Sequence, residues 1–469
     1  MDCVKIVNAD EFIAHEKEFI SGGKNNARDD AATTASVNKI IADVRAEGDN
    51  AVRRYAARFD SAVPDTFEVP VETAKGAWEN LKSAEPVLAS SLELAADHIR
   101  RFGELQKKQL IPFEAEIEPG IFAGQRVIPV DRAAVYVPAG RFPLISSALM
   151  GLIPASVAGV GEKVLVSPPG KNALPDHRIL AAAYLGGADR IYALGGAQAI
   201  AALALGTETI PRMDLIVGPG NKYVAAAKRL LFGEVGIDFI AGPTDVLIIS
   251  DTSGSSDKVD RVENDARLIA EAGNLTAEAA DLIAADMLAQ AEHDPDARAR
   301  ALVPDREMAE QIKRALESRL ARLSTAATAR ASLEAGGLII IYGAREEAVK
   351  IANQIAPEHL ELHVSSPDKW TGDLRNYGSL FIGSAAAEAL GDYSAGINHT
   401  LPTSASARFT GGLSVRNFLK TVTTLRCGRD SGYVQSLAAA ENIARAEGLV
   451  GHAESAALRI LHERQPEGL

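Results

Sequence analysis

Between residues 120 and 250 the chain repeats one pattern: a short run rich in β-branched residues, then a Gly or Pro, then an Ala-rich stretch. The runs that share this pattern are AAVYVPAG, KVLVSPPG, RIYALGG, MDLIVGPG and DVLIIS. Short strands that alternate with helices at this spacing are typical of a parallel, doubly wound sheet. In such sheets small ligands bind in loops at the carboxyl ends of the strands, so we expect functional residues there.

A second region of the same kind contains the runs GLIIIYG, LELHVSS and GSLFIGS, which helical segments separate. Before about Leu110 the apolar spacing predicts helices, with a turn at Gly48-Asp49, and helices are expected again from about Gly432 to His462. A chain of 469 residues is too long for one ordinary core. We therefore predict an α/β protein with two Rossmann-like, doubly wound α/β/α domains and helical N-terminal and C-terminal extensions.

The composition excludes several classes of protein. Hydrophobic residues make up 47% of the chain and charged residues 24%, which is ordinary for a globular protein. A net charge of −13 argues against nucleic acid as a partner, because phosphates are bound by clustered Lys and Arg. Two cysteines cannot build a disulfide framework, and no uninterrupted apolar run approaches the ~18 residues of a membrane span. We expect a cytoplasmic protein without a signal peptide.

Groups that bind metals or transfer protons gather in the second half of the chain. Gln290 and His293 are three residues apart in a helical stretch and share one face. Elsewhere, imidazoles stand near carboxylates: Glu358 and His359 are adjacent, seven residues separate Asp392 from His399, and five separate Glu447 from His452. These groups suit a borderline divalent metal such as zinc, although each could instead be a helix cap or a satisfied polar residue. The remaining histidines we interpret as solvated or without a role: His15, His98, His177, His363 and His462.

Two Gly-rich turns, at 195–203 (GGAQAIAAL) and 218–224 (GPGNKYV), each follow an expected strand and open a helix. The free N–H groups of such a helix start can bind an anion such as a pyrophosphate. No G-x-G-x-x-G fingerprint accompanies these turns, so each could equally be a plain loop between a strand and a helix.

From about residue 35 to its C-terminal helices the chain resembles the histidinol dehydrogenase family. The blocks that carry this resemblance are RVIPVDRAAVYVPAG, LGGAQAIAALALGTETIP, DLIVGPGNKYVAAAKR, AGPTDVLIISD, AQAEHDP, APEHLEL and GDYSAGINHTLPTSASARFTGGLSVRNFLK. The family implies a zinc- and NAD-dependent enzyme that oxidises L-histidinol through the aldehyde to L-histidine. It also implies a homodimer with one zinc ion per subunit.

Residue by residue, the resemblance implies a catalytic pair, Glu358 and His359. His359 would accept the alcohol proton, and Glu358 would activate the water that attacks the aldehyde. The implied zinc ligands are Gln290, His293, Asp392 and His452. The implied substrate contacts are Thr244, Gln290, His293, His359, Asp392, His399, Glu447 and His452. The implied NAD contacts are Tyr136, Gln198 and Asn221.

The resemblance also implies how the chain is divided. Residues 1–135 and 245–412 would form a discontinuous α/β domain that carries the metal and the catalytic residues, and residues 136–244 would form the NAD-binding domain. Residues 413–469 would be a helical dimerisation segment, from which the partner subunit lends Glu447 and His452 to the site.

Three departures from the family pattern leave a second substrate open. The chain has PAG at 138–140 where many members have PGG, and Thr244 stands where the family has a substrate-contacting Ser. An acidic stretch at about 254–275 looks like an insertion without an evident role, and Arg141 beside the PAG turn could meet an anionic group. The alternative is therefore a paralogous dehydrogenase of another primary alcohol, such as a sulfonated propanediol.

Overall fold

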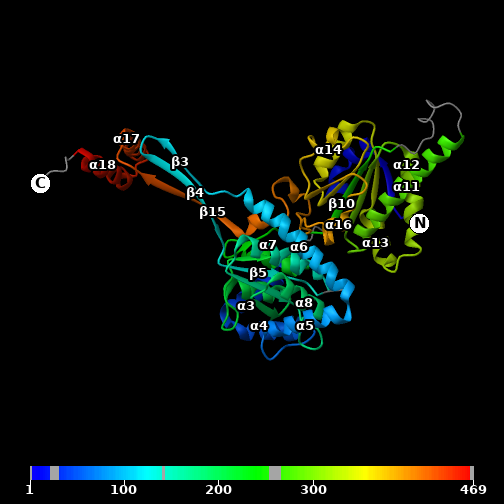
Figure 1. Cartoon of the computed structure of the whole chain (residues 1–469), viewed down its shortest axis with the longest axis horizontal. Helices are drawn as coiled ribbons and strands as arrows, with labels where there is room; N and C mark the ends of the chain where they lie inside the picture. The colour runs from blue at the N-terminus through cyan, green and yellow to red at the C-terminus, as the bar shows by residue number, and fades with distance from the viewer. Residues whose placement is uncertain (1–2, 22–30, 140–142, 253–265, 465–469) are drawn as a thin grey trace.

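The computed structural model describes residues 3–21, 31–139, 143–252 and 266–464. The chain forms two α/β bodies and a long arm (Figure 1). Arg141 and residues 254–265 of the expected insertion lie outside the described residues. We call the part built on the strands between residues 132 and 237 the first body, and the part built on the strands between 245 and 382 the second body. The arm is the sheet formed by residues 113–129 and 419–427, together with the helices that follow it.

The first body has a six-stranded sheet in the order β2-β7-β6-β5-β8-β9. All its neighbouring strands are parallel except the short β2, which pairs antiparallel with β7. Its strands are β2 (Glu68–Val69), β5 (Arg132–Tyr136), β6 (Glu162–Ser167), β7 (Arg190–Ala193), β8 (Leu215–Val217) and β9 (Gly236–Ile237). The direction of winding reverses between the parallel strands β5 and β8, and the crevice between the carboxyl ends of two such strands is where doubly wound sheets bind ligands.

Helices cover both faces of this sheet, and each face has its own apolar core. One face is covered by α5 (Val71–Ala84), α6 (Pro86–Lys108), α7 (Ile145–Ala158) and α8 (His177–Gly186). The other is covered by α3 (Ala31–Glu47), α4 (Asp49–Phe59), α9 (Gly196–Leu205) and α10 (Lys222–Leu231). The helices α3 to α6 thus pack on the first body, whereas the expected division placed residues 1–135 with the second. The reason is that their apolar faces, through residues such as Val52 and Trp78, are buried against the first sheet.

The second body has a wholly parallel six-stranded sheet in the order β1-β12-β11-β10-β13-β14. Its strands are β1 (Lys5–Asn8), β10 (Asp245–Ser250), β11 (Arg298–Val303), β12 (Leu338–Ile341), β13 (His359–His363) and β14 (Ser379–Ile382). Here the direction of winding reverses between β10 and β13, so this body repeats the topology of the first. The predicted doubly wound α/β/α architecture is confirmed for both bodies.

Helices again form two layers. One face packs against α11 (Ala266–Ala291), α12 (Arg306–Leu320) and α13 (Ala326–Gly336), and the other against α1 (Ala9–Ala14), α14 (Arg345–Ile355) and α15 (Asp368–Thr371). Two short helices complete the body, α2 (Glu16–Ser21) and α16 (Glu388–Tyr393).

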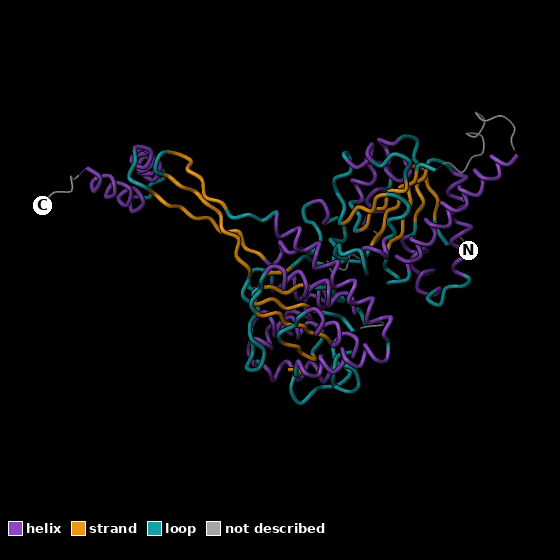
Figure 2. The backbone as a smooth tube through the Cα atoms, in the orientation of Figure 1, coloured by secondary structure: helices purple, strands orange, loops and turns teal. Residues whose placement is uncertain are grey.

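The arm extends from the first body, away from the second (Figures 1 and 2). Its antiparallel strands, in the order β15-β4-β3, are β3 (Phe113–Glu118), β4 (Ile121–Pro129) and β15 (Leu419–Cys427). Two 3₁₀ turns, Ser406–Arg408 and Val415–Phe418, precede β15, and α17 (Ser431–Ala446) and α18 (Val450–Arg464) form the tip. The expectation that residues 413–469 are helical is therefore wrong for the first part of this segment. Residues 419–427 form β15, an exposed strand that pairs with β4.

The loop after α16 joins the two bodies. Nδ1 of His98 on α6 lies 2.7 Å from the carbonyl of Ser394, and the side chain of Asn398 donates to the carbonyl of Met150 on α7 at 2.7 Å. His98, which we had interpreted as solvated, therefore holds this loop to the first body. Within the described residues, no helix is long and apolar enough to cross a membrane.

Candidate active site between the two sheets

The predicted functional residues occupy opposite edges of the two sheets. In the first body, Tyr136 ends β5, Gln198 lies on the first turn of α9 after β7, and Asn221 caps α10 after β8, all at carboxyl ends as the sequence predicts. In the second body the expectation was wrong. Thr244 and Glu358 directly precede β10 and β13, so the polar cluster lies at the amino ends of the strands.

Glu358 is held by both the side chain and the backbone at the start of β10. Its Oε2 accepts a 2.5 Å hydrogen bond from the hydroxyl of Thr244 and a 3.1 Å bond from the backbone N–H of Asp245. In return, the N–H of Glu358 donates to Oδ1 of Asp245 at 3.1 Å. Burial raises the pKa of Glu358 to about 7, although the charge of His359 and the Thr244 hydroxyl oppose that rise. A carboxyl group with such a pKa is suited to act as a base near neutral pH.

Asp245 is buried and has a buried cation for a partner. Nη1 of Arg300 on β11 lies 3.4 Å from Oδ2 of Asp245, and its Nη2 donates to the carbonyl of Phe19 at 2.9 Å. Burial raises the pKa of Asp245 and lowers that of Arg300 to about 10, because both charges have left water. The pair therefore compensates a charge that the core would otherwise leave isolated.

Three carboxylates surround the imidazole of His359, which is 3% exposed. Its Nδ1 lies 3.5 Å from Glu388 and 3.9 Å from Glu358, and its Nε2 lies 3.5 Å from Oδ1 of Asp392. Burial opposes a charged imidazole, but these carboxylates outweigh burial and raise the pKa of His359 well above its usual value. The ring therefore binds a proton strongly, beside two carboxyl groups of α16 and the one that precedes β13.

Gln290, on the last turn of α11, lies between Thr244 and Glu388 and is fully buried. One end of its amide is 2.5 Å from the Thr244 hydroxyl, and the other is 2.5 Å from Oε1 of Glu388. Burial raises the pKa of Glu388 well above the usual range. The backbone N–H of Asp245 lies 3.0 Å from the amide atom that faces Thr244, so that atom is the oxygen, and the amide nitrogen donates to Glu388.

Asp392, on α16, lies where several imidazoles meet. Burial opposes its charge, but the hydrogen bond and charge of His359, together with His399 and His293, lower its pKa. His399 donates from Nδ1 to the carbonyl of Asp392 at 2.8 Å, and its Nε2 lies 3.0 Å from the hydroxyl of Ser147 on α7. His293, just past α11, is exposed. The structure therefore brings Gln290, His293 and Asp392 to one region, with His399 connecting the region to the first body.

His452 and Glu447 are not part of this cluster. His452 lies on α18 and Glu447 ends α17, both exposed at the tip of the arm. Figure 1 shows that this tip is remote from α16 and β10 of the same chain. A single chain thus supplies three of the four expected metal ligands and leaves the fourth on the arm.

In the first body, a glycine-lined crevice surrounds the predicted NAD contacts. The hydroxyl of Tyr136 accepts from the N–H of Gly196 at 3.1 Å, and Asn221 caps α10 by accepting from Tyr223 and Val224 at 3.0 and 3.2 Å. The amide of Gln198 is buried beside the carboxyl group of Asp60. Burial raises the pKa of Asp60 to about 6, while hydrogen bonds from the N–H of Gly195 and from Gln198 oppose that rise.

A buried ion pair holds the second glycine turn of this crevice. Lys228, on α10, pairs with Asp238 and donates to the carbonyl of Gly218 at 3.0 Å, while Asp238 accepts from the N–H of Gly218 at 2.8 Å. Gly218 has φ +111°, and a Cβ there would strike the carbonyl of Tyr136. Only glycine therefore allows the turn to pass so close to the end of β5.

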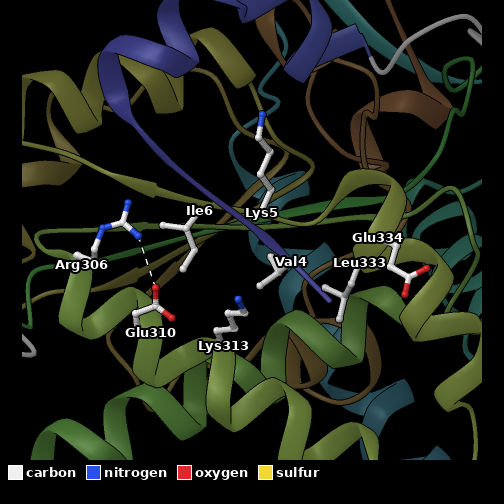
Figure 3. A pocket seen from close by; sticks show the side chains of 8 residues that line it. All are labelled: Val4, Lys5, Ile6, Arg306, Glu310, Lys313, Leu333 and Glu334. Carbon is white, nitrogen blue, oxygen red and sulfur yellow. Dashed lines mark hydrogen bonds and ion pairs between the residues drawn. The ribbon is translucent and has the colours of Figure 1, made fainter. Parts of the chain in front are cut away.

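A cavity of about 360 Å³ lies elsewhere, at the β1 edge of the second sheet (Figure 3). Its walls come from β1, α12 and α13. Two of the basic side chains that line it are in ion pairs, since Arg306 pairs with Glu310 and Lys5 pairs with Glu11. The residues that line it are Val4, Lys5, Ile6, Arg306, Glu310, Lys313, Leu333 and Glu334. It shares no residue with the predicted site, and we assign it no role.

Two members of the cluster, Asp245 and Glu388, were missed by the sequence analysis. Asp245 adjoins Thr244, and Glu388 stands four residues before Asp392, one helical turn away on the same face. That spacing was a usable signal, since it places a second carboxylate beside the predicted ligand.

The chain matches one family of sequences over most of its length. A sequence profile described as histidinol dehydrogenase matches residues 24–263 and 267–460. Proteins named histidinol dehydrogenase from Methylococcus capsulatus and Thermus thermophilus are both 43% identical, over 429 and 424 residues. The first comparison covers 91% of both chains, and the second 90% of this chain and 93% of the relative. The crystal structure of the enzyme of that name from Elizabethkingia anophelis superposes with a TM-score of 0.86 at 30% identity, covering 99% of this chain and 100% of the other.

We predict that Arg300→Met lowers the free energy of unfolding of the second body by about 3–5 kcal/mol at neutral pH. The substitution leaves the Asp245 carboxylate buried without its cation. Urea denaturation followed by the fluorescence of Trp370, which is buried in this body, measures the change in a Trp78→Phe background. Arg319→Met is the matched control, because its pair with Asp281 is exposed and should contribute at most about 1 kcal/mol. Equal effects of the two substitutions would contradict the buried-pair assignment.

Proposed function

The chain belongs to the histidinol dehydrogenase family, and we propose that it oxidises L-histidinol with NAD to L-histidinaldehyde and then to L-histidine. The observation that carries this proposal is the buried Glu358–His359 pair with Asp392 beside it. The reaction needs two proton transfers in succession. The enclosed imidazole of His359 and the adjacent Glu358, whose pKa is about 7, can each accept one of these protons.

Zinc fits the residues that the second body gathers. We propose that Gln290, His293 and Asp392 hold one ion together with His452 from a second copy of the chain. Two imidazoles, a carboxylate and an amide oxygen suit zinc, and the buried amide of Gln290 already lies next to the carboxyl groups of the site. When bound, the metal would supply an anchor for the imidazole and amine of the substrate.

In the first oxidation, we propose that His359 takes the proton of the alcohol while the carbon gives a hydride to NAD. The carboxylates at 3.5 and 3.9 Å from the ring would stabilise the imidazolium that forms. Each turnover must begin with a neutral His359. This requires that the negative charge of the surrounding carboxylates be partly compensated. A divalent cation on Asp392 would provide this compensation, because that carboxylate is one of those that raise the pKa of His359.

In the second oxidation, Glu358 is proposed to take a proton from the water that adds to the aldehyde. The resulting hydrate then gives its hydride to a second NAD and becomes the carboxylic acid. The Thr244 hydroxyl and the N–H of Asp245 hold the Glu358 carboxylate in place for this step. Oriented donors keep a base pointed at one position without any rearrangement during the reaction.

We propose that NAD binds along the carboxyl edge of the first sheet, through Tyr136, Gln198 and Asn221. The starts of α9 and α10 both point to this edge, so the positive ends of their dipoles favour the anionic pyrophosphate. Gln198, on the first turn of α9, offers its amide to the cofactor. The bridge from His399 to Ser147 connects this crevice to the cluster of the second body.

The tip of the arm has the surface that a second copy of the chain could cover. Its exposed apolar side chains include Ile443, Val450, Leu458 and Leu461, each more than half exposed. We propose a homodimer in which this surface is buried and each arm lends Glu447 and His452 to the site of the other chain. Both cysteines, Cys3 and Cys427, are free, in keeping with the reducing cytoplasm in which we place the enzyme.

The second candidate function is oxidation of another primary alcohol, such as a sulfonated propanediol. Thr244 favours it, because this residue directly contacts Glu358 and Gln290 and carries a methyl group that a serine would lack. We expect the purified enzyme to form NADH from NAD with L-histidinol and not with a propanediol sulfonate, as measured by absorbance. Turnover of the sulfonate without turnover of L-histidinol would reverse this assignment.

The pKa of Glu358 predicts the pH dependence of the second oxidation. Only the ionised carboxylate can accept a proton, so with L-histidinaldehyde as substrate the rate should fall about tenfold per pH unit below about 7. Thr244→Val removes a hydroxyl that stabilises the charged form, which should move this limb to higher pH. Thr244→Ser keeps the hydroxyl and should leave the limb in place. An unmoved limb in the valine variant would exclude Glu358 as the titrating base.

Shared sites predict complementation between two inactive variants. His293→Ala and His452→Ala should each be inactive alone, because each lacks one zinc ligand in every site. Unfolding and refolding them together makes mixed dimers, in which one site has both ligands intact, so NADH formation should return. If His452 served its own chain, every site in the mixture would lack a ligand and no activity would return.

A further inference from the structure

Strand β13 carries a column of ionisable side chains. His359, Glu361 and His363 alternate along the strand and therefore face the same side of the sheet, the side covered by α11. On α11, Asp286 is one turn before Gln290, so both point to this column. Gln290 lies toward the amino end of β13, where His359 stands. Asp286 lies toward the carboxyl end, near Glu361 and His363.

The group of Asp286, Glu361 and His363 is compact, with Asp286 partly buried and the other two side chains buried. The ligand atoms of Asp286, Glu361 and His363 all lie within 4.8 Å of one another. Nε2 of His363 is 2.9 Å from Oε2 of Glu361, yet neither of these buried atoms makes a hydrogen bond of acceptable geometry to any described residue. Glu361 is fully buried and His363 is 8% exposed. Two unsatisfied atoms thus point into the space between the three side chains.

The two carboxyl groups of this site compete for one proton. Burial raises the pKa of Asp286 to about 7, and Glu361 raises it further through its charge and a hydrogen bond, while the nearby His363 opposes that rise. Two carboxyl groups that bond each other must share a proton, because two carboxylates offer only acceptors. A divalent cation in place of that proton would balance both carboxylates and leave the imidazole neutral.

The position of the group also suits a ligand. His363 ends β13 beside Ser250, the last residue of β10, and the winding of the second sheet reverses between these two strands. The carboxyl ends at such a reversal are where doubly wound sheets bind ligands. The predicted catalytic residues occupy the amino ends instead, so this position is not used by the proposed reaction.

We propose that Asp286, Glu361 and His363 form a second divalent-cation site, separate from the one that contains Gln290, His293 and Asp392. One imidazole nitrogen and two carboxylate oxygens suit zinc, and also cobalt or manganese, with water completing the coordination. An ion at this site links α11 to β13 one turn below Gln290. It would therefore fix the helix that presents Gln290 and His293.

The metal content of the full-length enzyme tests this site. The protein is stripped with a chelator, reloaded with an excess of Zn²⁺, desalted and analysed by mass spectrometry of the metal. We expect two ions per chain in the native enzyme, and one per chain in His363→Gln and in Asp286→Asn. Asp281→Asn is the matched control, because Asp281 lies on the same helix but is exposed, so it should retain two ions.

His293→Ala separates this proposal from the proposed function, since it should lose only the other ion and keep the one held by His363. If His293→Ala retained both ions while His363→Gln lost one, the ligand set of the proposed function would fail and this second site would stand. One ion per native chain, lost in His293→Ala and kept in His363→Gln, would overturn the second site. Because His363→Gln could fail to fold, crystals of the native enzyme soaked in Co²⁺ provide an independent test. An anomalous peak among the three side chains supports the site, and its absence refutes it.

Discussion

Two reciprocal hydrogen bonds hold the centre of the second body together. The N–H of Asp245 donates to the side chain of Glu358, and the N–H of Glu358 donates to the side chain of Asp245. They join the starts of β10 and β13 and hold the register in which Val246 faces His359. A slip by one residue would turn His359 and every second residue after it to the opposite face, away from α11. The positions of the base, of Gln290 and of the buried acids all depend on this register.

Two cationic side chains explain why the core tolerates several buried carboxyl groups. Arg300 compensates the charge of Asp245, and His359 lies among Glu358, Glu388 and Asp392. A charge moved out of water is stable only with a partner at short range. The cluster therefore forms one electrostatic unit, in which the loss of one member changes the protonation of the others. This interdependence is what allows a carboxyl group with a pKa of about 7 to lie beside a strongly basic imidazole.

Much of the fold could be predicted from local pattern. All eight predicted apolar runs contain strands, because each is short and apolar, and most are buried on both faces. The strand β11 was missed, since its sequence RARALV contains two arginines that do not resemble a buried strand. Arg300 can be there only because Asp245 lies on the neighbouring strand. The arm strands were missed for the opposite reason: with both faces exposed over most of their length, β3 and β15 lack the apolar signal of a core strand.

The sequence alone therefore determined the class of fold, the family and the identity of the candidate residues, since periodicity and motif order are local properties of the chain. The structure determined which of these residues meet. It brought Thr244, Gln290 and Glu358 together from distant segments, added Glu388 and Asp245, and placed His452 on a remote arm. It also assigned α3 to α6 to the first body. Such contacts depend on strand order and on the burial of apolar faces, which join segments far apart in the chain and leave no trace in local spacing.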